Sequence, residues 1–237
     1  MNLTLTLTKK EIRSYFNAPA AYIVLVIFLL LSGWFFASPL FINNQANLRS
    51  LFGIIPLLYL FFIPAITMGL ISREKNSGTI ELLATLPIKD EQIIMGKFWA
   101  SLLLIGIGLL FTLIHLITIV ILGTNVDYGS LFCGYLGLLL LGAVYSSIGI
   151  FASSISSNQI VSLIISFFII LFFFVIKYFL IFVPDFLVGL FQYISIDYHL
   201  SNITRGVIDT RNIIYFISLT LLFLKLAQTA LENRNWK

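Results

Sequence analysis

Six apolar runs, each about as long as a bilayer is thick, are the feature that most constrains how this 237-residue chain can fold. A helix crosses the hydrocarbon core with about 20 apolar residues, and its backbone polar groups are satisfied within the helix. The runs cover residues 20–38, 51–71, 97–122, 131–152, 159–176 and 212–230. Apolar residues make up 59% of the chain and charged residues 10%, against roughly 45–50% and 25% in soluble domains. We therefore predict an all-α polytopic membrane protein with six transmembrane helices in a single domain, residues 1–237.

The distribution of lysine and arginine predicts the orientation, because cytoplasmic connections carry an excess of these residues. With both termini inside, the inner side holds Lys9, Lys10, Arg13, Arg73, Lys75, Lys89, Lys97, Arg234 and Lys237. The outer side then holds only Arg49, Lys177, Arg205 and Arg211. We therefore expect both termini, and the connection between the second and third spans, to be cytoplasmic. The net charge of +4 favours anionic lipid headgroups as a partner rather than nucleic acid.

A polar island at residues 72–91 separates the second span from the third. Its charged residues are Arg73, Glu74, Lys75, Glu81, Lys89, Asp90 and Glu91. Such a density of charge is too costly in hydrocarbon, so the island must lie in water. Within it, Asn76-Ser77-Gly78 predicts a turn, Thr79 a helix start, and Pro87 the end of that helix. The island therefore predicts a short helix of about two turns, presented on the membrane surface.

Residues 1–18 alternate apolar and charged side chains. Leu3 to Leu7 alternates strictly, which by itself is typical of a strand. We favour an amphipathic interfacial helix from about Thr8, with Ile12, Tyr15 and Phe16 toward lipid and the cations toward headgroups. A cleaved signal peptide is the alternative, but the apolar run that follows is too long for one and lacks a convincing cleavage site.

Two spans carry local signals. The second contains Pro56 and Pro64, which predict a kink. The fourth is rich in small residues, which let helix backbones approach closely in lipid. These are Gly142, Ala143, Ser146, Ser147, Gly149, Ala152 and Ser153.

The apolar segment from Tyr178 to Ile194 is predicted not to span the membrane. Pro184-Asp185 and Gly189 interrupt it, and each half is too short to cross. Two interpretations stay open: a pair of interfacial helices, or a re-entrant hairpin that dips in from the outer side. The following stretch, residues 195–211, is expected to face the exterior water.

The island carries a spaced motif that resembles a known family. Glu74, Gly78-Thr79, Glu81-Leu82-Leu83 and Pro87, followed by Gly96-Lys97, are similar to the first cytoplasmic loop of ABC-2 type transporter permeases. The resemblance implies that residues 72–91 form the coupling loop, whose short helix docks on an ATP-hydrolysing subunit. The residues it assigns to the ATPase contact are Glu74, Gly78, Thr79, Glu81, Leu82, Leu83 and Pro87.

The family resemblance also implies an assembly. Two permease chains, identical or paralogous, would combine with two separate ABC ATPase subunits that hold ATP and Mg²⁺, in the bacterial inner membrane. Residues 177–211 would form an extracytoplasmic hairpin over the outer end of the path, where an auxiliary subunit could bind. Residues 206–209 and 231–236 resemble the permease subunits associated with bacterial gliding motility. The permease chain itself would bind no cofactor and would not be an enzyme.

The residues alone support no catalytic or metal site. Gly96-Lys97 is followed by Phe98, and Glu91 stands where a phosphate-binding loop needs glycine. His115 and Ser146, inside predicted spans, are candidates for a substrate path, although side-chain packing explains both more simply. Two other functions stay open: a non-transporting membrane anchor that transmits ATPase motion to an extracytoplasmic partner, and an ion-coupled secondary transporter. The second is disfavoured because the apolar cores of the spans lack Asp and Glu.

Overall fold

The computed structural model describes residues 3–42, 48–80, 88–123 and 126–232, and these form helices and short connections without any strand. The chain begins with α1 (Leu3–Asn17) and α2 (Pro19–Ile42), followed by α3 (Arg49–Thr67) and the short α4 (Ser72–Asn76). Two long helices come next, α6 (Asp90–Leu122) and α7 (Tyr128–Ile155). The remaining elements are α8 (Gln159–Phe179), η1 (Leu180–Phe182), α9 (Asp185–Ile194), α10 (Ile196–Thr204) and α11 (Thr210–Glu232).

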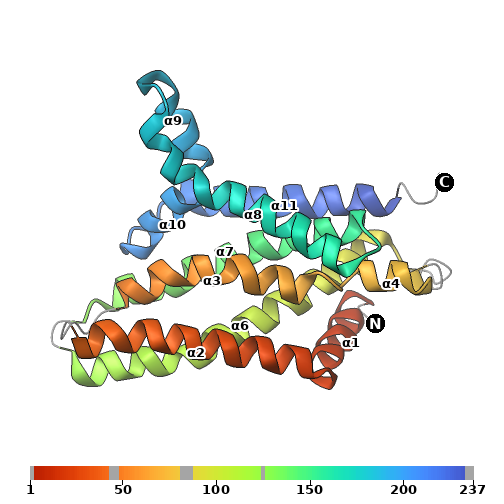
Figure 1. Cartoon of the computed structure of the whole chain (residues 1–237), viewed down its shortest axis with the longest axis horizontal. Helices are drawn as coiled ribbons and strands as arrows, with labels where there is room; N and C mark the ends of the chain where they lie inside the picture. The colour runs from red at the N-terminus through yellow and green to blue at the C-terminus, as the bar shows by residue number, and fades with distance from the viewer. Residues whose placement is uncertain (1–2, 43–47, 81–87, 124–125, 233–237) are drawn as a thin grey trace.

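Six helical segments are long and apolar enough to cross a membrane, which confirms the predicted number of spans. They are Pro19–Ile42, Arg49–Asn76, Asp90–Leu122, Tyr128–Ile155, Gln159–Phe182 and Thr210–Glu232. Figure 1 shows α1, α4 and the last turns of α11 at one end of the bundle, and α10 at the other. The polar island and both ends of the described chain therefore share one end, as an even number of spans requires. That this end is cytoplasmic stays a prediction.

The central helix of the bundle is α7. In its apolar stretch 72% of the residues are buried, against 22% in α2 and in α8. Small residues permit this burial: a Cβ on Gly134 would lie 2.2 Å from the Phe52 ring, and one on Gly149 would lie 1.9 Å from Thr67 Oγ1. The close helix approach predicted from the small residues of the fourth span is therefore confirmed. Pro56 and Pro64, the basis of the predicted kink, both lie inside α3.

The N-terminal helix α1 lies across the end of the bundle (Figure 1) and departs from the expectation in two ways. It begins at Leu3 rather than near Thr8, so the alternation of Leu3 to Leu7 does not mark a strand. Tyr15 and Phe16, which were expected on the lipid side, are only half-buried and pack in part on protein. The Tyr15 hydroxyl donates to the Ile66 carbonyl at 3.0 Å, and Phe16 packs against the apolar cluster at the start of α2.

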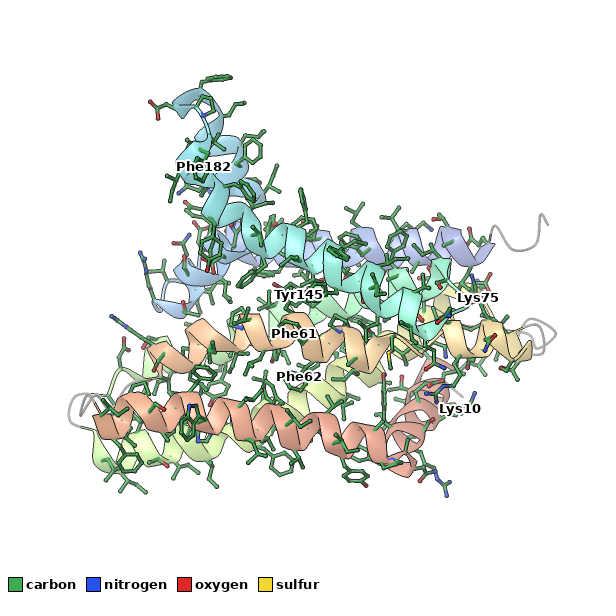
Figure 2. All side chains as sticks on the ribbon, viewed as in Figure 1. Lys10, Phe61, Phe62, Lys75, Tyr145 and Phe182 are labelled. Atoms are coloured by element: carbon green, nitrogen blue, oxygen red, sulfur yellow. The ribbon has the colours of Figure 1, made fainter. Side chains whose placement is uncertain are left out.

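Between α8 and α11 the chain forms η1, α9 and α10. Pro184 precedes α9 and separates it from η1, as predicted, but Gly189 lies inside α9 and does not interrupt it. One glycine destabilises a helix by only about 1 kcal/mol relative to alanine. The helical turns on either side of Gly189 are stable enough to offset that cost. At 10 residues, α9 is too short to span. It projects away from the bundle, with Phe182 near its start (Figures 1 and 2).

The helix α10 corrects an expectation about the segment that follows α9. Residues 195–211 were expected to face water, but Ile196, His199, Leu200 and Ile203 are buried. Leu200 and Ile203 pack over Gly137 of α7. Ile196, Leu200 and Ile203 have the helical spacing of a buried face, but the expectation of exposure rested on the charged residues around them.

Candidate coupling site

The described part of the polar island is a short helix and a turn. α4 ends at Asn76, and Gly78 follows with φ of 68°, in the left-handed region that glycine adopts without strain. The hydroxyls of Ser77 and Thr79 are hydrogen-bonded to each other at 2.9 Å, and Ile80 beyond them is buried. Residues 81–87 lie outside the described residues, and with them Glu81, Leu82, Leu83 and Pro87. The coupling helix itself therefore stays a prediction.

A buried lysine lies beside the base of the island. Lys97 is 2% exposed, and its ammonium lies 2.8 Å from Glu74 Oε2 and 3.1 Å from Glu11 Oε1. It also donates a hydrogen bond to the Leu70 carbonyl. A buried ammonium needs such compensation, because removing it from water without partners costs several kcal/mol. Two carboxylates and a carbonyl oxygen provide it here.

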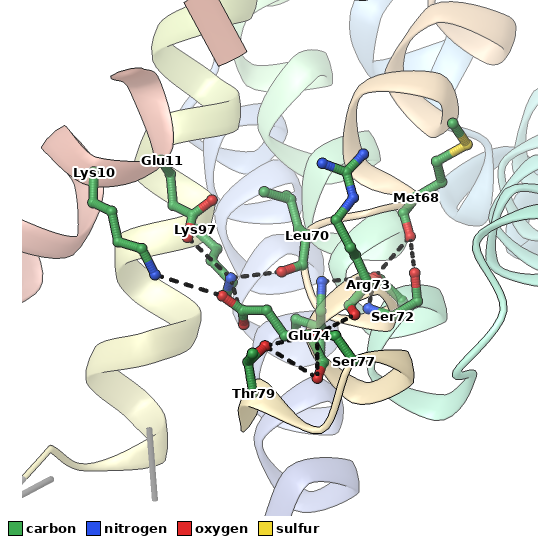
Figure 3. Close-up of polar contacts among 12 residues, drawn as sticks. Lys10, Glu11, Met68, Leu70, Ser72, Arg73, Glu74, Ser77, Thr79 and Lys97 are labelled. Carbon is green, nitrogen blue, oxygen red and sulfur yellow. Dashed lines mark hydrogen bonds and ion pairs between the residues drawn. The ribbon is translucent and has the colours of Figure 1, made fainter. Parts of the chain in front are cut away.

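The groups around Lys97 come from separate elements, as Figure 3 shows. Glu11 belongs to α1, Glu74 to α4 and Lys97 to α6, while Leu70 lies in the turn between α3 and α4. Lys10 of α1 adds a looser ion pair, with its ammonium 3.8 Å from Glu74 Oε1. We call Lys97, Glu11, Glu74 and Lys10 the basal charge cluster. It joins the N-terminal helix, the island and the third span at a single point.

The local sequence allows α1 and α6 to approach at this point. A Cβ on Gly96 would lie 2.8 Å from the Leu7 Cβ and 3.3 Å from the Thr4 carbonyl oxygen. The Thr8 hydroxyl lies 3.2 Å from the Gly96 carbonyl oxygen, to which it donates, and Thr8 is itself buried. Gly96 therefore lets α1 cross α6 closely enough for Glu11 to reach Lys97.

Hydrogen bonds also connect the island to the central helix. Ser153 of α7 accepts from the backbone N–H groups of Ile71 and Ser72, at 3.0 and 2.9 Å. Its hydroxyl donates to the Met68 carbonyl at 3.0 Å, and Lys75 donates to the carbonyl of Ser154. The backbone that leads into α4 is thereby fixed to the end of α7. A displacement of α4 would act directly on the most buried helix of the bundle.

Of the residues assigned to ATPase contact, three fall in the described part of the chain. Gly78 and Thr79 are exposed at the end of the bundle. Glu74 has a side chain only 16% exposed, and its carboxylate points toward Lys97 rather than outward (Figure 3). The geometry favours a positioning role for Glu74 within the basal charge cluster.

The two candidates for a substrate path are not brought together. His115 lies toward the C-terminal end of α6 and stacks on Phe36 of α2, with ring centroids 4.6 Å apart. Ser146 lies in the C-terminal half of α7 and is fully buried. Its hydroxyl has no hydrogen-bond partner among the described residues. These positions indicate no shared path between the two, and both roles stay predictions.

Sequence reasoning did not assign a role to Glu11 or Lys97. Lys97 was read as one cation among several on the predicted inner side and, with Gly96, as part of the family motif, and Glu11 as one of the polar residues of the N-terminal segment. One signal was available in the sequence. Lys97 follows a glycine and begins a long apolar run, and this position favours a lysine side chain that is buried in the protein. The partner could not be read, because Glu11 and Lys97 are 86 residues apart.

The comparison with known families adds one finding. Residues 35–185 match the family described as ABC-2 family transporter protein. The matched range runs from α2 to the start of α9, and so includes the island, Glu74 and Lys97. No curated protein matches the chain. Among the described residues, no group of three His, Cys, Asp or Glu side chains could hold a metal ion.

Proposed function

The chain belongs to the ABC-2 family of transporter proteins, and from this premise we propose that its polar island couples ATP hydrolysis on separate ATPase subunits to movement of the membrane helices. The family and the six apolar helices make the chain a membrane permease of an ABC transporter. The movement would drive export of a substrate. The permease would contact ATP and Mg²⁺ only through the ATPases that hold them.

The observation that carries the proposal is the basal charge cluster. A coupling loop must be mechanically continuous with the spans, since otherwise the motion of an ATPase would bend the loop alone. Glu74, at the base of the island, is held by an ammonium that is itself buried in the start of α6. Ser153 holds the neighbouring backbone to α7. A push on residues 78–87 would therefore reach α1, α6 and α7 together.

The assembly follows from the same proposal. Two copies of the chain, or one copy and a paralogue, would pair with two ABC ATPase subunits in the bacterial inner membrane, with both termini cytoplasmic. The outer faces of α2 and α8 are mostly unburied in the single chain, which leaves surface for lipid and for a second permease. The proposal also includes a relation to the gliding-motility permeases and the binding of an extracytoplasmic auxiliary subunit.

A second candidate function is mechanical transmission without transport. The observation that favours it is the projecting segment formed by η1 and α9, whose Ile181, Phe182 and Phe186 are more than four-fifths exposed. An apolar projection at the outer end could contact an extracytoplasmic protein. Both functions require the same coupling loop. Reconstituted vesicles separate them, because only a transporter moves a substrate without the extracytoplasmic partner.

The proposal is tested at Leu83, the predicted anchor of the coupling helix. Leu83→Asp places a carboxylate where an apolar contact is expected, at a cost of several kcal/mol. We expect the variant to insert and purify normally but to lose its ATPase subunits on affinity purification. Leu83→Ala should weaken retention less, since it removes only about 1–3 kcal/mol of apolar contact.

The matched control is Val207→Asp, which makes an equivalent change at an exposed position between α10 and α11. It should retain the full complement of ATPase. If Leu83→Asp co-purified with ATPase as well as Val207→Asp does, the island would be only a linker.

A further inference from the structure

A cavity of about 210 Å³ opens beside the basal charge cluster. It lies between α1, the start of α2, the turn that follows α3, and the first residue of α8. Its lining combines two kinds of surface. Arg73, Lys10 and Gln159 supply charged and amide groups, and an apolar floor includes Val24, Ile66 and Leu104. A cavity that is cationic on one side and apolar on the other fits an anionic amphiphile better than a free ion.

The charge balance of the cavity favours an anion. Glu11 and Glu74 also line it, but both carboxylates lie within ion-pair distance of the Lys97 ammonium, at 3.1 and 2.8 Å. With Lys10, Arg73 and Lys97 against these two carboxylates, the group carries one excess positive charge. The excess is available at Arg73, whose guanidinium points away from the cluster (Figure 3). No carboxylate of the described residues forms an ion pair with Arg73.

Gly69 leaves space for a phosphate beside the Arg73 guanidinium. A Cβ on Gly69 would lie 3.3 Å from Gln159 Oε1 and 3.5 Å from Arg73 Nη2, so both polar ends lie directly over the backbone of residue 69. The missing side chain leaves space beside them. A guanidinium binds phosphate oxygens through two parallel N–H donors, and the Gln159 amide adds a further donor.

The other side of the cavity is neutral and apolar. Burial raises the pKa of the Tyr15 phenol, so its hydroxyl stays protonated and donates to the Ile66 carbonyl. Val24 continues along one face of α2 through Ile27 and Leu31, which are 44% and 38% exposed. This face begins at the cavity and runs along the span, as an acyl chain would.

We propose that this cavity binds an anionic phospholipid, with the phosphodiester on Arg73 and Lys10 and an acyl chain along the Val24 face of α2. Basic pockets between transmembrane helices at the inner leaflet are typical sites for anionic headgroups. The bound lipid would contact α1, α2 and the turn before α4, and so would stabilise the arrangement that the basal charge cluster holds. Lipid binding at this site would not require transport, because all of the lining residues belong to the permease chain itself.

Native mass spectrometry of the purified chain, titrated with phosphatidylglycerol or phosphatidylcholine of identical acyl chains, tests the proposal. We expect the wild-type chain to retain phosphatidylglycerol selectively. Arg73→Gln should weaken that binding about tenfold, as expected for lost charge-assisted hydrogen bonds, and leave phosphatidylcholine unchanged. Gly69→Leu should fill the cavity and abolish the selectivity. Arg13→Gln is the matched control, since Arg13 is exposed on the same helix as Lys10 but outside the cavity.

Four results would overturn the proposal. Equal retention of the two lipids would show no anionic site. Equal effects of Arg73→Gln and Arg13→Gln would show only general surface attraction. Displacement of the lipid by millimolar inorganic phosphate would identify a free-anion site, and loss of dimer rather than of lipid in Arg73→Gln would assign the cavity to a second copy. None of these measurements requires the ATPase, so the lipid proposal can fail without affecting the coupling proposal.

Discussion

At the scale of single residues, Lys97 is the side chain that holds α1, α4 and α6 together at the island end of the bundle. Its ammonium is compensated by Glu11, Glu74 and the Leu70 carbonyl. Removing the lysine leaves two carboxylates close together and partly buried. Glu11 then loses its ion pair, Glu74 keeps only the looser pair with Lys10 at 3.8 Å, and the two carboxylates repel each other. The Lys97 ammonium stabilises the basal charge cluster, and a substitution of this one residue is therefore enough to disrupt the cluster.

We predict that Lys97→Met destabilises the protein by about 3–5 kcal/mol, the usual cost of breaking a buried ion pair. Thermal unfolding of the detergent-purified chain measures the effect. The control is Lys177→Met in the last turn of α8, where Lys177 pairs with Asp197 at 2.8 Å but both side chains are about 30% exposed. That change should cost about 1 kcal/mol or less. Equal shifts in the two variants would contradict a special role for Lys97.

The candidate site was only partly predictable at this scale. The motif placed Glu74, Gly78 and Thr79 at the island, and Gly78 has the positive φ that a turn of this kind requires. The contact between Glu74 and Lys97 depends on how α4 returns toward α6, which the local sequence does not encode. Both residues belong to the motif that carried the family resemblance, and the fold brings their side chains together.

At the scale of elements, the long spans could be predicted because hydrocarbon imposes a length and a composition on each of them. Short elements could not, since tertiary contacts decide them. α1 begins at Leu3 because its first turns pack on α6 at Gly96. Likewise, α10 is buried on α7 at Gly137, although its polar residues indicated an exposed segment.

The packing of α7 on α3 gives a prediction for the elements. In Gly149→Ala the new methyl group would lie 1.9 Å from Thr67 Oγ1, so the two helices must separate. We expect destabilisation of about 1–3 kcal/mol, as for overpacking in other cores. Gly106→Ala in α6 is the control, because a Cβ there meets nothing within 4 Å. It should be neutral or slightly stabilising, since alanine favours helix over glycine. Unfolding temperatures of the two variants compare these effects directly.

At the scale of the whole molecule, the proposed coupling and lipid sites lie at one end of the bundle and the proposed partner surface toward the other. The island, the basal charge cluster and the Arg73 cavity share one end of the bundle, and the projecting segment lies toward the other (Figure 1). The coupling proposal requires the first end to be cytoplasmic, since ATP is available there. The excess of lysine and arginine at that end supports this orientation, and the fold requires that the two ends face opposite sides.

Cysteine labelling in sealed cells tests the orientation. Cys133, which is buried and free, is first replaced by alanine, and single cysteines are placed at Asn76 on α4 and at Phe186 on α9. Both positions are exposed. We expect a membrane-impermeant maleimide to label position 186 in intact cells and position 76 only after the membrane is opened. A cysteine at Asn235, beyond α11, should behave as position 76 does, because six spans return the chain to its starting side. Labelling of position 76 in intact cells would place the island outside and exclude contact with a cytoplasmic ATPase, whatever the stability of the basal charge cluster.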